Sequence, residues 1–357
     1  MDFDFADILI EVMERGASDL HMTAGSPPMV RERGKLSALD YPMLTPTAVR
    51  EIVYSILSND QRQKLETDWQ IDLAYSIPGR ARFRVNAYFQ RASLGAAFRL
   101  IPQDIPKLDD LGLPATIREF TKKPRGFVLV TGPTGSGKST TLAAMIDLIN
   151  KERAEHIMTI EDPIEFLHRH QRCIVNQREV GADAKTFSLA LKAALRQDPD
   201  VILVGEMRDL DTISTALTAA ETGHLVFATL HTQDTAQTID RIVDVFPPAQ
   251  QHQVRVQLSV ALQGIVTQQL LPTADGTSRV AATEVLVPTS AVRNLIREGK
   301  THQVYSTLQT GATHGMQTMD ASLADLVRRN KITRELAEAR SSSPEELRRL
   351  MGTVRVA

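Results

Sequence analysis

Residues 132–139 read GPTGSGKS and match the phosphate-binding pattern G-x-x-x-x-G-K-[ST]. The apolar run FVLVT before them predicts a buried strand, and TTLAAMIDLIN after them predicts a helix, which is the context that this pattern requires. We expect Lys138 to reach the β- and γ-phosphates and Ser139 to bind Mg²⁺. A dinucleotide-binding fold does not fit, because no third glycine stands at the required spacing. The predicted nucleotide-binding residues are Gly132, Pro133, Thr134, Gly135, Ser136, Gly137, Lys138, Ser139 and Thr140.

A second element lies at Val201–Glu206, which reads VILVGE. An apolar strand ending in acids is typical of the Walker B element, where many P-loop enzymes place one acid for Mg²⁺ and another for the attacking water. Here Gly205 occupies the first of these positions, so only Glu206 remains. We expect Glu206 to act on Mg²⁺, partly through a water. Ser139 and Glu206 are therefore the predicted metal site, and the chemistry is one carboxylate short.

The stretch Ile160–Phe166, IEDPIEF, carries three carboxylates directly after another apolar run. One interpretation is a helix start, with Asp162 as the N-cap, Pro163 in the first turn and Glu165 three positions after the cap. The other is catalytic, because ligands of an open α/β sheet lie beyond the carboxyl ends of its strands. The missing Walker B acid favours the catalytic interpretation. Asp162 then caps the turn or faces Mg²⁺-bound water, and Glu161 has the weakest case.

Two histidines border the apolar run in Gly223–Thr232, which reads GHLVFATLHT. Seven residues of strand span roughly 23 Å, so His224 and His231 cannot share one metal ion. His231 stands at the carboxyl end of the predicted strand, where it can hydrogen-bond the γ-phosphate or a catalytic carboxylate. His224 stands at the far end and is a candidate for a subunit contact. The alternative for both is a polar residue that merely ends a strand.

Length and composition bound the class of protein. With 357 residues, two domains are favoured over one, and a net charge of −2 gives no basic field for nucleic acid. The single cysteine, Cys173, excludes an intramolecular disulfide framework. The N-terminus carries acids where a signal peptide needs basic residues, and no apolar run approaches the ~20 residues of a membrane span. We therefore expect any membrane connection to run through a partner.

Three segments differ in their residue patterns. Residues 1–101 alternate short helical and β-like patterns, which predicts a small α+β domain. Residues 102–115 are rich in proline, which blocks helix formation, and are predicted to be an interdomain linker. In residues 116–357, apolar runs alternate with helical patterns, which predicts an α/β fold with helices on both sides of a parallel sheet. The C-terminal part is predicted to be mostly helical, including Gln251–Leu271.

The phosphate loop, IEDPIEF, VILVGEMRD and GHLVFATLHT occur here in the order seen in the secretion/type IV pilus ATPases, and the chain resembles that family over nearly its whole length. SDLHMTAGSPPMVR at 18–31, AVRNLIREG at 291–299 and TMDASLADLVRRNKIT at 318–333 are similar to its retraction branch. The resemblance implies an N-terminal PAS-like domain and a C-terminal RecA-like P-loop NTPase domain with a helical C-terminal part. It also implies a homo-hexameric motor that hydrolyses ATP with Mg²⁺ and powers pilus retraction and twitching motility.

The same resemblance implies roles for residues and partners. Glu165 becomes the general base for water and Glu206 the support of Mg²⁺, with Lys138 and His231 as further catalytic residues and His224 in the same histidine motif. The motor is expected to be cytoplasmic, at the inner face of the cell membrane, where it pulls on the inner-membrane pilus platform protein. A paralogous retraction ATPase is an optional further partner, and no nucleic acid is expected.

Arginines of the N-terminal segment are candidates for a cation that meets charge on the γ-phosphate. Arg82 and Arg84 are two residues apart and share one face if they lie on a strand, and Arg99 follows later. The resemblance favours all three reaching the nucleotide, whereas a solvated basic edge strand explains the first two equally well. The resemblance assigns the helix pattern at 291–299 to pulling rather than to ATP binding, and an ordinary surface helix is the alternative.

Other functions compete with the retraction motor. A retraction accessory paralogue of similar length fits the same motifs. A nucleic-acid translocase is disfavoured by the near-neutral charge and by the lack of a basic, aromatic-rich segment. An assembly ATPase is disfavoured because one cysteine cannot form a four-cysteine zinc site. A regulatory module that hydrolyses nothing is disfavoured by the acids Glu165 and Glu206.

Overall fold

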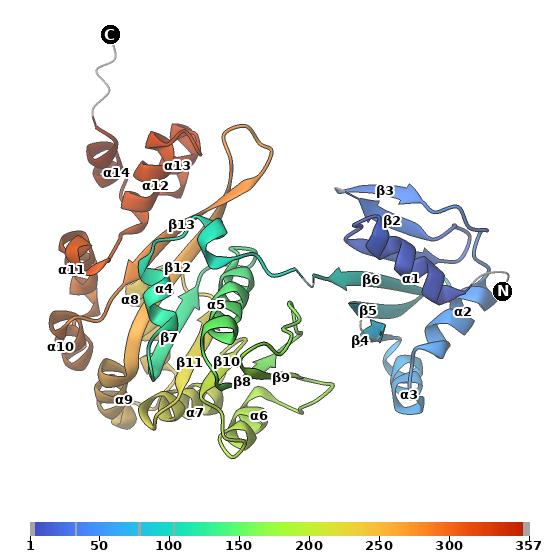
Figure 1. Ribbon diagram of the computed structural model, residues 1–357, viewed down its shortest axis with the longest axis horizontal. Helices are drawn as coiled ribbons and strands as arrows, with labels where there is room; N and C mark the ends of the chain where they lie inside the picture. Colours follow the sequence, from blue (N-terminus) through green and yellow to red (C-terminus); the bar gives the residue numbers. More distant parts are fainter. Residues whose placement is uncertain (1–3, 33, 78–79, 103, 353–357) are drawn as a thin grey trace, which may run out of the picture. The chain divides into compact units, whose positions relative to one another are not determined.

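The computed structural model describes residues 4–32, 34–77, 80–102 and 104–352, and the chain divides into two compact units, Met1–Gln103 and Asp104–Ala357 (Figure 1). Each unit has its own sheet and its own buried apolar cluster. The mixed α/β fold predicted from the sequence is confirmed. None of the helices in the described parts of the chain combines the length and the apolarity that a membrane span needs.

The first unit combines an antiparallel sheet with helices. Its elements are α1 (Phe5–Glu14), β1 (Asp19–Thr23), β2 (Met29–Glu32), β3 (Lys35–Ala38), α2 (Pro46–Ser55), α3 (Asn59–Asp68), β4 (Gln70–Ile77), β5 (Ala81–Gln90) and β6 (Ser93–Ile101). The strand order is β3-β2-β1-β6-β5-β4. Strand β5 alternates as a half-buried strand should: Phe83 and Val85 are fully buried, whereas Arg84 between them is exposed.

The second unit is built on a mostly parallel sheet. Its strands are β7 (Gly126–Thr131), β8 (His156–Glu161), β9 (Ile174–Glu179), β10 (Val201–Val204), β11 (Leu225–Leu230), β12 (Leu262–Pro272) and β13 (Arg279–Leu286). They lie in the order β13-β12-β7-β11-β10-β8-β9, and only β13 pairs antiparallel with its neighbour among the described strands. Every residue of β7, β10 and β11 is buried, as the continuous apolar runs predict.

Helices cover both faces of this sheet (Figure 1). The elements are η1 (Leu108–Leu111), α4 (Thr116–Thr121), α5 (Lys138–Glu152), α6 (Phe187–Ala194), α7 (Leu210–Glu221), α8 (Thr235–Asp244), α9 (Pro248–Ala261), α10 (Ser290–Glu298), η2 (Thr301–Gln303), α11 (Val304–Thr310), η3 (Ala312–His314), α12 (Met319–Arg328), α13 (Arg334–Arg340) and α14 (Pro344–Met351). Alternate residues of β7 enter different clusters: Phe127 packs with α6 to α10, and Val128 packs with η1, α4 and α5.

The helix predicted over Gln251–Leu271 is wrong in its second half. Helix α9 ends at Ala261, and β12 begins at the next residue. The run Ile265-Val266-Thr267 is fully buried between β7 and β13, where β-branched side chains pack well. The apolar pattern alone therefore does not indicate where the helix changes to a strand.

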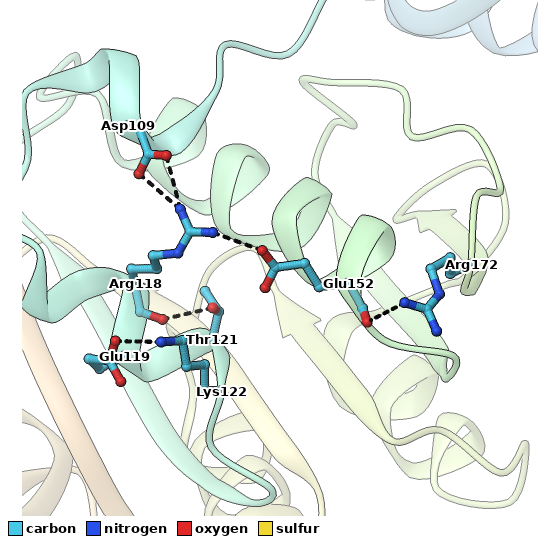
Figure 2. Close-up of polar contacts among 7 residues, drawn as sticks. All are labelled: Asp109, Arg118, Glu119, Thr121, Lys122, Glu152 and Arg172. Atoms are coloured by element: carbon cyan, nitrogen blue, oxygen red, sulfur yellow. Dashed lines mark hydrogen bonds and ion pairs between the residues drawn. The ribbon is translucent and has the colours of Figure 1, made fainter.

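Arg118 is one of the residues that tie the start of the second unit to its body. Arg118 of α4 donates through Nη1 to both carboxylate oxygens of Asp109, at 3.1 and 2.9 Å, and through Nη2 to Glu152 of α5 at 2.8 Å (Figure 2). Leu108 of η1 is buried in the cluster that contains α5 residues. Residues 104–115, most of the segment predicted as a linker, thus belong to the second unit.

Candidate nucleotide site

A cavity of about 370 Å³ opens where β7 passes into α5. All its lining residues belong to the second unit, and they include seven of the nine predicted loop residues, 134–140. Lys138 begins α5, so the loop delivers its lysine at the N-terminus of a helix, where backbone N–H groups and the helix dipole favour an anion. The phosphate loop is therefore placed as the sequence predicts.

Gly132, one of the two loop residues that do not line the cavity, lies against strand β12. A Cβ on Gly132 would lie 2.2 Å from the backbone oxygen of Gln268, and the glycine has a φ of +137°, so no other residue fits there. The Gln268 side chain in turn accepts a hydrogen bond from the Thr141 hydroxyl at 2.9 Å. Strand β12 therefore supports the phosphate loop, a role hidden by the predicted helix.

The lysine and one serine of the loop fit a phosphate ligand. Lys138 is 9% exposed, and its Nζ donates to the carbonyl oxygens of Gly132 and Pro133 at 2.8 and 3.0 Å. Burial lowers the pKa of Lys138, while the charges of Glu206 and Glu165 oppose that shift. The hydroxyl of Ser136 is buried and has no hydrogen-bond partner among the described residues. A phosphate oxygen would give both donors the acceptor that suits them.

Glu206 lines this cavity and forms hydrogen bonds with the side chains of Arg208 and His231. One of its oxygens accepts from Arg208 Nε at 2.6 Å and from His231 Nε2 at 3.0 Å. Arg208, and to a smaller extent His231, hold the pKa of Glu206 below its ordinary value, so this carboxylate is charged at neutral pH. The structure thus brings His231 to a carboxylate at the nucleotide side, which was one of the two partners expected for it.

Gly205 explains why the Walker B strand carries one acid rather than two. A Cβ at this position would lie 3.1 Å from the Ile160 carbonyl oxygen and 3.2 Å from the Glu161 Cα. The Gly205 carbonyl also accepts a hydrogen bond from the Thr229 hydroxyl. The ends of β8 and β10 approach too closely here for any side chain without displacement.

The helix start predicted at Asp162 does not form. Residues 162–173 contain neither helix nor strand, and the Asp162–Pro163 peptide bond is cis. The N–H of Ile164 donates to the Glu179 carboxylate on β9 at 3.1 Å, a partner outside any local helical turn. The capping interpretation is therefore wrong, and side chains of a neighbouring strand take the place of helical hydrogen bonds.

The acids of this stretch occupy different environments. Asp162 and Glu165 are exposed and line the cavity. Glu161 also lines it, but burial raises its pKa, and it accepts from the Thr159 hydroxyl at 2.6 Å. The acid with the weakest case in the sequence is thus the most enclosed one, because the end of β10 covers it through Gly205.

Several predicted residues lie outside the cavity. His224 lies directly before β11, at the end opposite His231, and its Nδ1 lies 3.0 Å from the Ala219 carbonyl oxygen. Arg82 and Arg84 lie on β5 of the first unit, and Arg84 is the register partner of Arg99 on β6. The Arg99 Nε donates to Asp19 at 2.8 Å. Their predicted contact with the nucleotide stays a prediction.

Other lining residues carried no signal in the sequence. His168, Phe187, Leu270 and Arg279 all line the cavity. Burial lowers the pKa of His168 to about 4, and its Nδ1 is buried without a hydrogen-bond partner among the described residues. These residues follow no motif spacing, since they come from a loop, a helix and two strands. Only the β12–β13 pairing would have placed Leu270 and Arg279 here.

The helix at 291–299 forms as α10, with Gly299 in the left-handed conformation at its end. Val292 and Ile296 are fully buried, and Leu295 packs against the same cluster. Arg293 donates to the carbonyl oxygen of Val260 at 2.9 Å, at the end of α9. The apolar face of this helix is thus used inside the protein, so a partner contact must use its polar side.

The chain matches the model of the family described as "Type II/IV secretion system protein" over residues 4–354. It is 51% identical over 342 residues to the type IV pilus retraction ATPase PilT of Pseudomonas aeruginosa, covering 96% of this chain and 99% of that one. It is 43% identical over 345 residues to the type IV pilus ATPase PilU of the same organism, covering 97% and 90%.

A solved structure is similar over almost the whole chain. The crystal structure of the pilus retraction motor PilT with bound ADP has a TM-score of 0.91 and 53% identity, and the match covers 98% of this chain and 100% of that one. The family model matches nearly the whole chain, and the identities of 51% and 43% are higher than a shared fold alone would give. The chain therefore belongs to the family of type II/IV secretion system proteins.

Proposed function

We propose that this chain is an ATP-hydrolysing motor that powers retraction of type IV pili. The observation that carries the proposal is the identity of 51% to a retraction ATPase over 96% of the chain. The cavity supports it, because the phosphate loop, Glu206 and Glu165 meet there in one place. ATP is the nucleotide expected in the cavity, as the likeness to a motor with bound ADP suggests.

The residues of the cavity divide the chemistry between them. Lys138 and the loop N–H groups bind the β- and γ-phosphates, and Ser139 with Glu206 would hold Mg²⁺, partly through water. That ion supplies charge neutralisation on the phosphates when it is bound. Glu165 accepts the proton of the water that attacks the γ-phosphorus. His231, bonded to Glu206 at 3.0 Å, orients that carboxylate.

The proposed assembly is a homo-hexamer at the inner face of the cell membrane. In it, Arg82, Arg84 or Arg99 of the first unit meets the γ-phosphate charge, and a pilus platform protein in the membrane receives the motion. The family membership supports this assembly, and the exposed side chain of Arg84 is free to reach a ligand. A paralogous ATPase is a further partner in this proposal.

A second candidate is an accessory retraction ATPase. The identity of 43% to PilU over 97% of the chain favours it over any function of another class. The two candidates make the same ATPase prediction but differ in cells. A retraction motor restores pilus retraction by itself, whereas an accessory one needs the principal motor.

The test is complementation of a bacterium that lacks both retraction ATPases, with twitching as the readout and ATP hydrolysis by the purified chain measured in parallel. We expect the wild-type chain to restore twitching and the Lys138→Ala variant to fail. Hydrolysis without twitching in that strain, but with twitching when the principal motor is present, would identify the accessory function. Absence of ATP hydrolysis would contradict both candidates.

A further inference from the structure

The acidic loop, residues 162–168, carries Glu165 without a helix or strand of its own. The position of a base on such a loop depends on the hydrogen bonds that hold the loop backbone around it. The N–H of Ile164, the residue directly before Glu165, donates to Glu179 Oε2 at 3.1 Å. The loop is therefore anchored by side chains, and these anchors decide where the Glu165 carboxylate lies.

One side chain of β9, that of Gln177, forms three hydrogen bonds with the acidic loop and with Glu161. Gln177 Nε2 donates to the Phe166 carbonyl oxygen at 2.9 Å and to Glu161 Oε1 at 3.2 Å. Gln177 Oε1 accepts from the N–H of His168 at 2.8 Å. The amide can only face this way, because two of its partners accept and the third donates. A single glutamine thus bonds the loop directly after Glu165 and the carboxylate of Glu161, the residue after which the loop begins.

The sheet places this glutamine by register. Strands β8 and β9 are parallel, with Thr159 opposite Gln177 and Glu161 opposite Glu179. The Thr159 hydroxyl donates to the same Glu161 oxygen that Gln177 binds, at 2.6 Å. Gln177 and Glu179 are two residues apart, so both point to the side of the sheet where the loop lies. Asn176 points to the other side, where its amide lies 2.9 Å from His156 Nε2.

We infer that Gln177 is a positioning residue for ATP hydrolysis, which sets the Glu165 carboxylate through the acidic loop. This inference rests on the proposed base role of Glu165. Gln177 does not line the cavity, so it acts without touching nucleotide. A general base must lie within hydrogen-bond reach of its water, and a displacement of ~1 Å can cost a factor of ~10² in rate.

The first test is the Gln177→Leu variant, which keeps the size of the side chain and removes its polar atoms. We expect kcat to fall roughly 10- to 100-fold while the KM for ATP and the affinity for ADP stay at wild-type values. The phosphate loop keeps its own contacts, so binding is not affected. The matched control is Asn176→Leu, one residue away on the opposite side of β9, which we expect to hydrolyse ATP at the wild-type rate.

A second variant guards against misfolding. Gln177→Glu preserves shape and the acceptor for the His168 N–H, but it places an acceptor where Phe166 and Glu161 need a donor. We expect kcat to fall as in Gln177→Leu, with circular dichroism and ADP affinity unchanged. A normal kcat in either folded variant, or an equal loss of kcat and ADP affinity, would overturn the inference.

The combination with Glu165→Gln separates this inference from the base assignment. If Gln177 acts through Glu165, single-turnover hydrolysis by the double variant equals that of Glu165→Gln alone. Multiplied losses in the double variant would show that Gln177 acts elsewhere, and this inference would be wrong. Wild-type turnover in Glu165→Gln alone would instead refute the base role, whatever Gln177 does.

Discussion

The phosphate loop and the acidic loop face the same cavity but are built in different ways. In the phosphate loop, the polar contacts of Lys138 run to Gly132 and Pro133, only a few residues back in the chain. In the acidic loop, the contacts of Ile164 and Phe166 run to Glu179 and Gln177 on another strand.

The difference separates binding from turnover. A loop whose lysine is held by its own carbonyl groups does not depend on β9 to bind a phosphate, and its motif is legible in a short stretch of sequence. A loop held by a neighbouring strand places its carboxylate only when the sheet beside it is correct. We therefore expect damage to the two loops to give distinct kinetic results, and the variants below test this in order of expected effect.

The largest effect is expected for Glu165→Gln. The variant keeps the loop backbone contacts and removes the base, so kcat falls by roughly 10²–10⁴-fold. ATP binding remains, because the phosphate loop is untouched. Steady-state hydrolysis with a parallel measurement of nucleotide affinity tests this, and near-normal turnover would refute the base assignment.

Lys138→Ala should reduce nucleotide binding as well as hydrolysis, unlike Glu165→Gln. The substitution removes the buried ammonium group, so nucleotide affinity and hydrolysis fall together, with kcat/KM lower by roughly 10²–10³-fold. Titration with a fluorescent ADP analogue measures the affinity. Wild-type affinity in this variant would break the proposed division between a binding loop and a turnover loop.

A pH effect on stability is expected from His168, which lies at the end of the acidic loop. Its folded pKa of about 4 is below the unfolded value of ~6.5, so the unfolded chain binds the proton first as pH falls. Stability is lost progressively from pH ~6.5 down to the folded pKa, amounting to about 2 kcal/mol at pH 5. Urea unfolding of wild type and His168→Gln at pH 7.5 and pH 5 measures it. A difference between them that does not change with pH would contradict the burial of this imidazole.

The smallest effect is expected for Gly205→Ala, which adds a methyl group against the end of β8. The contacts of 3.1 and 3.2 Å require small shifts of Ile160 and Glu161, at a cost of about 1 kcal/mol. Because Glu161 directly precedes the acidic loop and accepts a hydrogen bond from Gln177, kcat should fall more than nucleotide affinity. Thermal unfolding and hydrolysis assays test this, and an unchanged Tm would show that the strands have room to spare.

The sequence predicts the parts of the molecule that depend on local pattern. Four buried strands, the phosphate loop and helices such as α5 and α7 each follow from a short run of residues, because burial and helix periodicity act over a few positions. The change from helix to strand after Ala261 is not legible. Pairing with β7 and β13 determines that these residues form a strand, and β7 is distant from them in the sequence.

The same limit applies to the candidate site. The carboxylates Glu165 and Glu206 could be predicted to face one cavity, since both follow strands whose carboxyl ends meet. The supports could not: Gln177 and Arg279 become neighbours of the cavity or of its loop only through strand register. The helix start at Asp162 failed for the same reason, because Glu179 competes for its N–H groups from outside the local sequence.

The close approach at Gly205 also limits how this enzyme can change under mutation. An acid at this position would give the Walker B strand the two-acid arrangement of other P-loop enzymes. Any side chain at this position requires the end of β8 to shift by a few tenths of an ångström, and the acidic loop begins directly after β8. An acid introduced at this position would therefore shift the start of the loop that carries Glu165, so the two carboxylates cannot be placed independently of each other.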